Sequence, residues 1–324
     1  MKAAIVNGPG QAPVFGEFEA PRSAAGLALV AVSAAALSTF SKSRSTGQHY
    51  SAEGRFPAIA GAEGVGRLVN GHRVYFVLPQ SPYGALAQSC LVDPAHCVPI
   101  PDALDDVTAA ALGNPGMSAW AALVERARIQ PGETVLVNGA TGSAGRLAVF
   151  LAKHLGAGRV IATARNAVDL ESLKQAGADA LIAFDLDRDP QAGGKAYERA
   201  LAREFSEGVD VVIDYLWGTS ARTIIVAIAK YVEDGRRVRF VHVGGASGAE
   251  SIDLPGAALR SSAISLMGSG LKSVPFDRLL DSVRRVFDVS AAVMPKIPMR
   301  VLPLEDIERA WQAPGSPRIV ISVS

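Results

Sequence analysis

The chain has 324 residues and a mass of 33.7 kDa, which suits two domains of ordinary size or one large enzyme. Hydrophobic residues make up 49% and charged residues 19%, so the composition supplies a core and excludes a disordered chain. The formal net charge of +1 argues against nucleic-acid binding as the main role. Two cysteines, Cys90 and Cys97, cannot build a disulfide framework or a four-thiolate zinc site. We therefore expect a cytoplasmic protein.

The N-terminal region carries no targeting or membrane signal. The apolar run of MKAAIVNGPG stops at Val6, which is too short for a signal peptide. The uncharged stretch from Ser23 to Ser41 is close to the length of a bilayer helix, but it is mostly Ala and Ser. Its segment Leu27–Val32 is more typical of a buried strand. We expect no membrane span.

Short β-like runs separated by Gly and Pro fill the first third of the chain. These runs are Ala3–Val6, Leu27–Val32, Gly64–Val69, Arg73–Leu78 and Leu86–Val92. The pattern predicts an irregular β domain over residues 1–114. After residue 270 come a helix, Phe276–Val289, and two short strands, Met299–Leu302 and Arg318–Val323. Because this tail is too short for a domain of its own, we expect residues 270–324 to complete the first domain.

Strands and helices alternate over residues 115–269. The expected strands are Thr134–Asn138, Arg159–Ala164, Ala180–Phe184, Val209–Asp214, Arg237–Val243 and Ser262–Met267. The expected helices between and before them are Ala119–Arg128, Ser143–Leu155, Val168–Ala176, Tyr197–Phe205 and Ser220–Lys230. Such alternation is typical of an α/β fold with a doubly wound parallel sheet.

A glycine-rich turn joins the first of these strands to a helix. Gly139, Gly142 and Gly145 would permit a tight turn, the approach of backbone amides to a pyrophosphate, and close packing of helix on strand. The alternative is a purely structural turn. Twenty residues after Gly145 stands Arg165, followed by Asn166, where an acidic residue would bind the ribose of NAD. An arginine there favours the 2′-phosphate of NADP(H), unless it is simply a solvated side chain at a strand end.

These motifs, in this order, resemble the medium-chain dehydrogenase/reductase superfamily, in its zinc-free quinone oxidoreductase-like and alkenal reductase-like branch. The resemblance covers nearly the whole chain. The segments that match the family are 56–66, 71–74, 84–88, 113–120, 139–145, 243–248 and 302–307. It implies a GroES-like β domain and a Rossmann domain with the active cleft between them. Zinc members have Cys, His and Cys where this chain has Ser38, Ala62 and Asn114. Because zinc prefers thiolate and imidazole ligands, we expect no metal.

The resemblance also implies a set of site residues. Tyr50, or its neighbour His49, is the expected proton donor, although the Gly47–Tyr50 spacing is one residue longer than usual. Ser118 would lie beside the nicotinamide or cap a helix start. Asp214 could orient a cofactor group or cap the next turn. The remaining expected cofactor contacts are Thr141, Ser143, Ala144, Val243, Gly244, Gly245, Met267 and Gly268.

Hydride transfer from NADPH to a conjugated carbonyl or a quinone is the function that this pattern implies. Without a metal to stabilise an alkoxide, an already activated acceptor is the better substrate. Two alternatives remain open, an enoyl-thioester reductase and a nucleotide-binding protein of the same fold without turnover. Relatives pair the last strand of the sheet across a two-fold axis, so we expect a homodimer.

Overall fold

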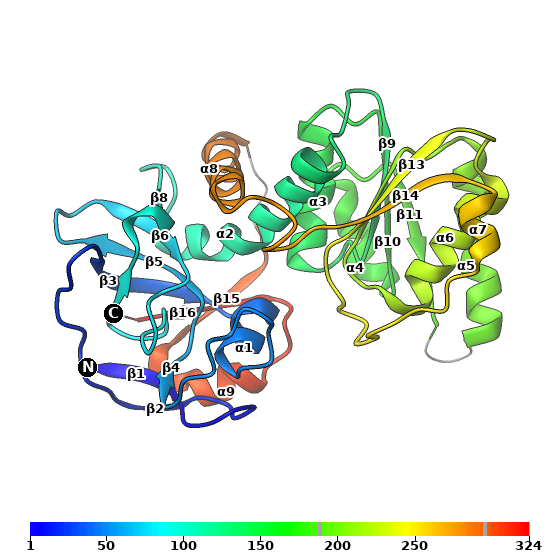
Figure 1. Ribbon diagram of the computed structural model, residues 1–324. Coiled ribbons are helices and arrows are strands. Elements are labelled where there is room, and N and C mark those ends of the chain that lie inside the picture. The colour runs from blue at the N-terminus through cyan, green and yellow to red at the C-terminus, as the bar shows by residue number, and fades with distance from the viewer. Residues whose placement is uncertain (187–189, 294–296, 324) are drawn as a thin grey trace. The chain divides into compact units, whose positions relative to one another are not determined.

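The computed structural model describes residues 1–186, 190–293 and 297–323, and it divides into two compact units (Figure 1). Unit 1 comprises Met1–Met117 and Val283–Ser324, and unit 2 comprises Ser118–Ser282. Both boundaries fall later than the sequence predicted. They lie inside helix α2 (Asp106–Trp120) and helix α8 (Phe276–Val293), so each of these helices contributes to both units.

Unit 1 is built mainly from antiparallel strands. A small sheet has the order β2-β1-β4, and a larger sheet has the order β15-β16-β3-β5-β6-β8, with β7 paired to β3. The strands are β1 Lys2–Val6, β2 Val14–Glu17, β3 Ala28–Ala36, β4 Ala58–Ile59, β5 Glu63–Leu68, β6 Arg73–Val77, β7 Ser89–Val92, β8 Cys97–Pro99, β15 Met299–Pro303 and β16 Arg318–Ser322. As expected, the C-terminal strands complete the N-terminal sheet, because β16 pairs with β3.

Short helices close the ends of unit 1. They are α1 Thr39–Ser45, η1 Pro94–His96, η4 Leu304–Asp306 and α9 Ile307–Gln312. Apolar side chains that alternate along β3, β6 and β7 form the core together with residues of α9 and β16, such as Ile307 and Ile321. The stretch that resembled a bilayer span is thus strand β3 and the start of α1. Over the described residues no helix is both long and apolar enough to cross a membrane.

The expected helix was Ala119–Arg128, and the part of α2 before Ala119 was not predicted, because Gly113, Pro115 and Gly116 signal a break rather than a helix. Packing explains why the helix continues. A Cβ at Gly113 would lie 2.2 Å from the ring of Tyr75, and a Cβ at Gly116 would lie 2.5 Å from Val286. The two glycines therefore let α2 approach β6 and α8 closely. The helix continues directly into a π-helical segment, Ala121–Arg126.

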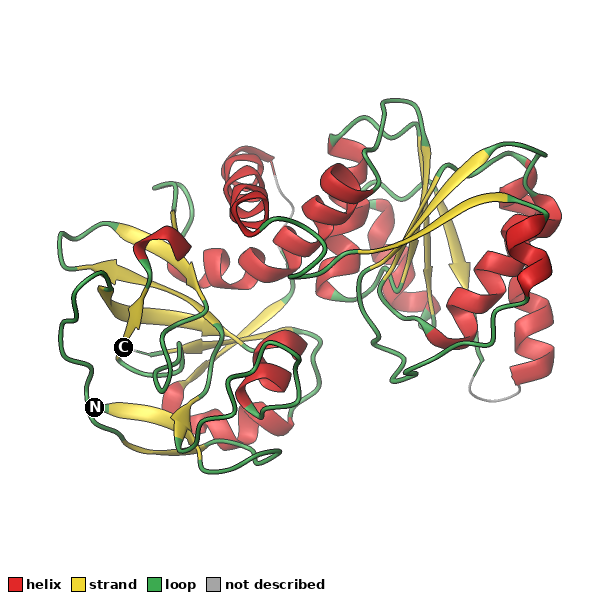
Figure 2. Ribbon diagram, viewed as in Figure 1, coloured by secondary structure: helices red, strands yellow, loops and turns green. Residues whose placement is uncertain are grey.

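Unit 2 is a doubly wound parallel sheet with helices on both faces (Figure 2). Its strand order is β11-β10-β9-β12-β13-β14, and neighbouring strands all pair in parallel. The strands are β9 Thr134–Asn138, β10 Arg159–Ala164, β11 Ala180–Ala183, β12 Val211–Asp214, β13 Arg237–His242 and β14 Ala263–Gly268. The helices are α3 Ser143–His154, α4 Ala167–Glu171, η3 Ser172–Lys174, α5 Pro190–Ser206, α6 Gly218–Tyr231 and α7 Gly256–Arg260.

Helices α5 and α6 cover one face of this sheet. Leu136, Val212 and Phe240 from three neighbouring strands pack with Phe205 and Ile224 from these helices. Strands β9 and β12 are buried almost throughout, as the continuous apolar runs in the sequence indicated. The face is apolar along most of its length, so polar residues on it are confined to the strand ends.

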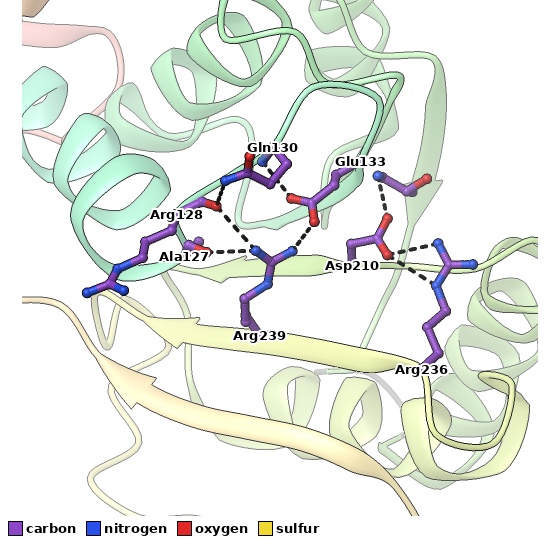
Figure 3. A network of polar contacts seen from close by, with 8 residues as sticks. Ala127, Arg128, Gln130, Glu133, Asp210, Arg236 and Arg239 are labelled. Carbon is purple, nitrogen blue, oxygen red and sulfur yellow. Dashed lines mark hydrogen bonds and ion pairs between the residues drawn. The ribbon is translucent and has the colours of Figure 1, made fainter.

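Ion pairs connect the amino-terminal parts of strands β9, β12 and β13 (Figure 3). Arg239, the third residue of β13, donates to Glu133, just before β9, and to the carbonyl of Ala127 at 2.8 Å. Asp210, just before β12, accepts from Arg236 at 2.9 and 3.1 Å. These contacts hold β9, β12 and β13 in register, and that register determines which residues meet at the opposite edge.

Candidate functional site

The glycine-rich turn lies at the carboxyl end of β9, the central strand of unit 2. Gly139 has a φ of +84°, a conformation that side chains with a Cβ rarely adopt. A Cβ at Gly145 would lie 2.3 Å from the carbonyl oxygen of Gly139. The glycines therefore make a tight turn and a close contact between helix and strand, as the sequence predicted. Gly142, by contrast, is exposed, and a Cβ there would make only an ordinary contact, 3.7 Å from the carbonyl oxygen of Gly139.

The first turn of α3 offers backbone donors at this edge. Gly142 is the N-cap and supplies no side-chain acceptor, and the first intrahelical bond runs from the amide of Arg146 to Gly142. The described contacts give no protein partner to the amides of Ser143, Ala144 and Gly145. Together with the positive end of the helix dipole, these donors fit a pyrophosphate. Thr141 lies in the turn itself, half-buried beside them.

The carboxyl end of β10 carries the expected arginine. Arg165 directly follows the strand and is exposed. Asn166 has a structural role as the N-cap of α4, where its side-chain oxygen accepts from the amides of Val168 and Asp169 at 2.9 and 3.4 Å. The sequence analysis missed Arg146, which donates to the hydroxyl of Ser172 at 3.0 Å and so lies next to α4. Its place in the first turn of α3 was the available signal.

The ends of β12, β13 and β14 form the other half of this edge. The amides of Val243 and Gly244 donate to the carbonyl of Asp214 at 2.7 and 3.3 Å, and Gly245 follows in the same loop. In β14, Met267 pairs with Val241 and Gly268 pairs with His242, so these expected contacts do end the last strand. The carbonyl of Gly268 accepts from Arg126 at 2.7 Å.

Ser118 lies inside helix α2, so the expectation that it caps a helix start is wrong. The helix begins twelve residues earlier, at Asp106, because the close packing of Gly113 and Gly116 allows it to pass through the Gly-Pro segment. Burial raises the pKa of Tyr215, the residue that follows β12, and the side chain of Ser118 opposes this shift. Ser118 therefore lies close to Tyr215, near the carboxyl edge of unit 2.

Tyr50 and His49 lie in unit 1, in the turn that follows α1. Tyr50 is 59% exposed, and its ring lies 4.1 Å from the imidazole of His49, measured between centroids. His49 Nδ1 is 2.8 Å from the hydroxyl of Ser51. Burial lowers the pKa of His49, and the nearby Arg44 lowers it further. His49 is therefore neutral at pH 7, whereas Tyr50 carries an accessible phenol.

The residues at the zinc-ligand positions of related enzymes meet around a buried carboxylate. The side chains of Ser38 and Asn114 both lower the pKa of Glu63 and so lie near its carboxylate, while Ala62 precedes it and is buried. Glu63 also accepts from the hydroxyl of Tyr75 at 3.2 Å. The described residues contain no group of three or more His, Cys, Asp or Glu side chains that could hold a metal ion.

A buried ion pair completes this cluster. Arg318 Nη2 lies 3.7 Å from Glu63 Oε1, and both side chains are almost inaccessible to solvent. Burial raises the pKa of Glu63, against the opposing effects of Arg318, Ser38, Tyr75 and Asn114. Burial likewise lowers the pKa of Arg318. Removal of one partner would leave an uncompensated buried charge, which is costly.

We expect Glu63→Gln and Arg318→Met each to lower the free energy of unfolding by about 3–5 kcal/mol. The double variant should lose less than the sum, with a coupling of about 0.5–3 kcal/mol, because neither charge then remains alone. Urea unfolding measures all three variants. The exposed pair Asp306–Arg309 of unit 1 is the control, and its variants should change stability by less than about 1 kcal/mol. Additive losses at Glu63 and Arg318 would show that the pair is not coupled.

Known proteins match parts of this chain in sequence. A family model described as zinc-binding dehydrogenase matches residues 144–287, a segment that contains none of Ser38, Ala62 and Asn114. A probable NADPH-dependent quinone reductase of Emericella nidulans is 30% identical over 221 residues, which cover 65% of this chain and 59% of that protein. A polyketide synthase of Streptomyces halstedii is 37% identical over 172 residues, half of this chain but only 3% of the synthase. The chain thus spans less than two thirds of these relatives.

Solved structures match over the full length. The quinone oxidoreductase of Thermus thermophilus, known also in complex with NADPH, superposes with a TM-score of 0.79 at 24% identity, and all of both chains is covered. A structure described as an NAD-dependent alcohol dehydrogenase reaches a TM-score of 0.82, also at 24% identity and full coverage. These likenesses establish the fold, a GroES-like β domain and a Rossmann domain. In fold the chain is therefore similar to quinone oxidoreductases, and over residues 144–287 it is similar to zinc-binding dehydrogenases, in agreement with the resemblance to the medium-chain dehydrogenase/reductase superfamily seen in the sequence.

Proposed function

We propose that this protein is an NADPH-dependent oxidoreductase whose acceptor is a conjugated carbonyl compound or a quinone. The observation that carries the proposal is the carboxyl edge of unit 2. There the first amides of α3, which have no partner among the described residues, lie beside the end of β10, where Arg165 is exposed. The name of the Emericella nidulans relative, an NADPH-dependent quinone reductase, supports the same cofactor and acceptor class.

Arg165 is the residue that would select NADPH over NADH. Its guanidinium would pair with the 2′-phosphate through charge-assisted hydrogen bonds. Arg146 would add a second positive charge on the neighbouring helix, where it lies beside α4. An NAD-specific site would instead need a carboxylate at the end of β10 to accept from the ribose hydroxyl.

The bound nicotinamide would supply a hydride, and the protein would supply a proton and a place for the acceptor. Tyr50 is the proposed proton donor, because its phenol is exposed and His49 is neutral at pH 7. Tyr50 belongs to unit 1, whereas the proposed cofactor contacts at the carboxyl edge of the sheet belong to unit 2. We also propose that the reaction needs no zinc, since Ser38, Ala62 and Asn114 offer no thiolate or imidazole.

An enoyl thioester is the second candidate acceptor. Similarity to several polyketide synthases favours it, including one of Mycobacterium tuberculosis that is 34% identical over 148 residues. The acceptor would be the same conjugated carbonyl group on a different carrier. The two acceptor classes therefore make equal demands on the cofactor edge and differ only in substrate recognition.

Arg165→Ala should weaken NADPH binding by roughly 10- to 100-fold, because a charge-assisted contact is lost. NADH binding should change by less than about twofold, since NADH has no 2′-phosphate. Fluorescence titration of each nucleotide measures both constants. Arg203→Ala, which alters an exposed arginine on α5, is the matched control. Equal affinity of the wild type for NADPH and NADH would contradict the assignment of Arg165.

Tyr50→Phe should lower kcat by about 100-fold or more while NADPH affinity stays unchanged, because only proton delivery is removed. Steady-state NADPH consumption would be followed with a benzoquinone, a 2-alkenal and a short enoyl thioester. Tyr231→Phe in unit 2 is the control for loss of a phenol. An unchanged kcat would assign the proton to another group. Tight NADPH binding with no turnover of any acceptor would favour a nucleotide-binding protein without catalysis.

The protein is expected to form a homodimer through strand β14. This strand ends the sheet, so one of its edges has no partner strand among the described residues, and Leu266 on it is 40% exposed. Light scattering should give twice the chain mass, and Leu266→Arg should shift the protein to monomer. A monomeric wild type at micromolar concentration would refute this expectation.

A further inference from the structure

Four polar residues form one row across the carboxyl end of the sheet in unit 2. Asn138 of β9 is in register with Thr163 of β10 and with Asp214 of β12, and Asp214 is in register with His242 of β13. Two residues earlier on each strand, the same face carries core apolar side chains such as Leu136. The row is thus the polar end of an apolar face.

Hydrogen bonds join the members of this row from strand to strand. The hydroxyl of Thr163 donates to Asn138 Oδ1 at 2.9 Å, and Asn138 Nδ2 donates to Asp214 Oδ1 at 2.8 Å. Asp214 Oδ2 lies 2.9 Å from His242 Nδ1. The first three residues are completely buried, whereas the His242 side chain is 35% exposed. His242 is therefore the point at which the row reaches the surface of this edge.

The surroundings of Asp214 fix the tautomer of His242. Asp214 also accepts from the amides of Leu216 and Trp217 at 3.1–3.2 Å, so it caps the turn after β12, which is one of the two roles expected from the sequence. An oxygen that serves as an acceptor requires the imidazole to carry its proton on Nδ1. With the proton on Nδ1, Nε2 is the nitrogen that can accept, and it lies on the side of the ring away from Asp214.

Trp217 holds the imidazole ring from one side. Its indole lies 4.4 Å from the His242 ring between centroids, with an interplanar angle of 41°. The backbone of Trp217 has a φ of +63°, which is strained for a bulky residue. Its amide bonds to Asp214 maintain this conformation. Such strain is found where surrounding structure enforces a functional geometry.

The strand order indicates which part of a dinucleotide would reach His242. In a doubly wound sheet the two nucleotide halves lie over the two halves of the sheet, on either side of the central strand. Arg165 at the end of β10 marks the adenosine half. Strands β12 and β13, on the other side of β9, belong to the nicotinamide half.

Resting on the proposed function, we propose that His242, oriented by Asp214 and Trp217, is a binding residue for the ribose of the nicotinamide half, with Nε2 accepting from a ribose hydroxyl. This assignment gives the buried row a role at its one exposed end. It predicts that His242 contributes to affinity for the whole dinucleotide and not to affinity for its adenosine half.

The test compares NADPH with adenosine 2′,5′-bisphosphate, which has the adenosine half alone. His242→Phe keeps an aromatic ring beside Trp217 but removes the acceptor. It should raise the Kd of NADPH about tenfold and leave that of the bisphosphate within about twofold. His242→Gln, whose amide oxygen can accept, should recover part of the NADPH affinity. His154→Phe, at an exposed histidine on α3, should change neither Kd.

Two results would overturn the inference while the proposed function stands. If the wild-type protein binds both ligands and His242→Phe leaves the Kd of NADPH unchanged, His242 makes no such contact. Equal weakening of both ligands by His242→Phe would indicate a general disturbance of the sheet edge. Wild-type protein that binds neither ligand would overturn the proposed function and this inference together. Isothermal titration calorimetry gives each Kd independently of turnover.

Discussion

The parallel pairing of β9 with β10 on one side and β12 on the other is the constraint on which the rest of unit 2 depends. It turns the carboxyl ends of all these strands toward one edge, so the glycine-rich turn, Arg165 and Asp214 share that edge although they are distant in sequence. Ion pairs at the amino ends, such as Arg239 with Glu133, fix the register on which this arrangement relies. A shift of one residue would turn Asn138 and Asp214 to the opposite face.

Both units bury polar groups that an apolar core could have replaced at lower cost. In unit 2 the row that ends at His242 satisfies each buried member with a neighbour on the adjacent strand. In unit 1 Glu63 accepts from Tyr75 and has Arg318 as its charged partner. The row of unit 2 specifies one arrangement because a partly satisfied alternative leaves an unpaired buried group. The ion pair of unit 1 does so because the loss of one partner leaves an uncompensated buried charge.

The sequence predicted the strands of unit 2 better than its helices. Continuous apolar runs such as Val211–Asp214 are typical of strands buried on both faces, and the structure confirms them. The part of helix α2 before Ala119 was missed because Gly113 and Pro115 are locally unfavourable in a helix. The contact of Gly113 with Tyr75, far away in the sequence, outweighs that local preference.

The sequence by itself determined the fold class, the position of the glycine-rich turn and the arginine at the end of β10. Each of these depends on residues close together in the chain, whose periodicity and backbone requirements are visible locally. Only the tertiary structure decided that Ser38 and Asn114 meet at Glu63, and that His242 ends a row begun by Thr163. These contacts join residues from different strands, so they follow from strand order and register, which local patterns do not encode.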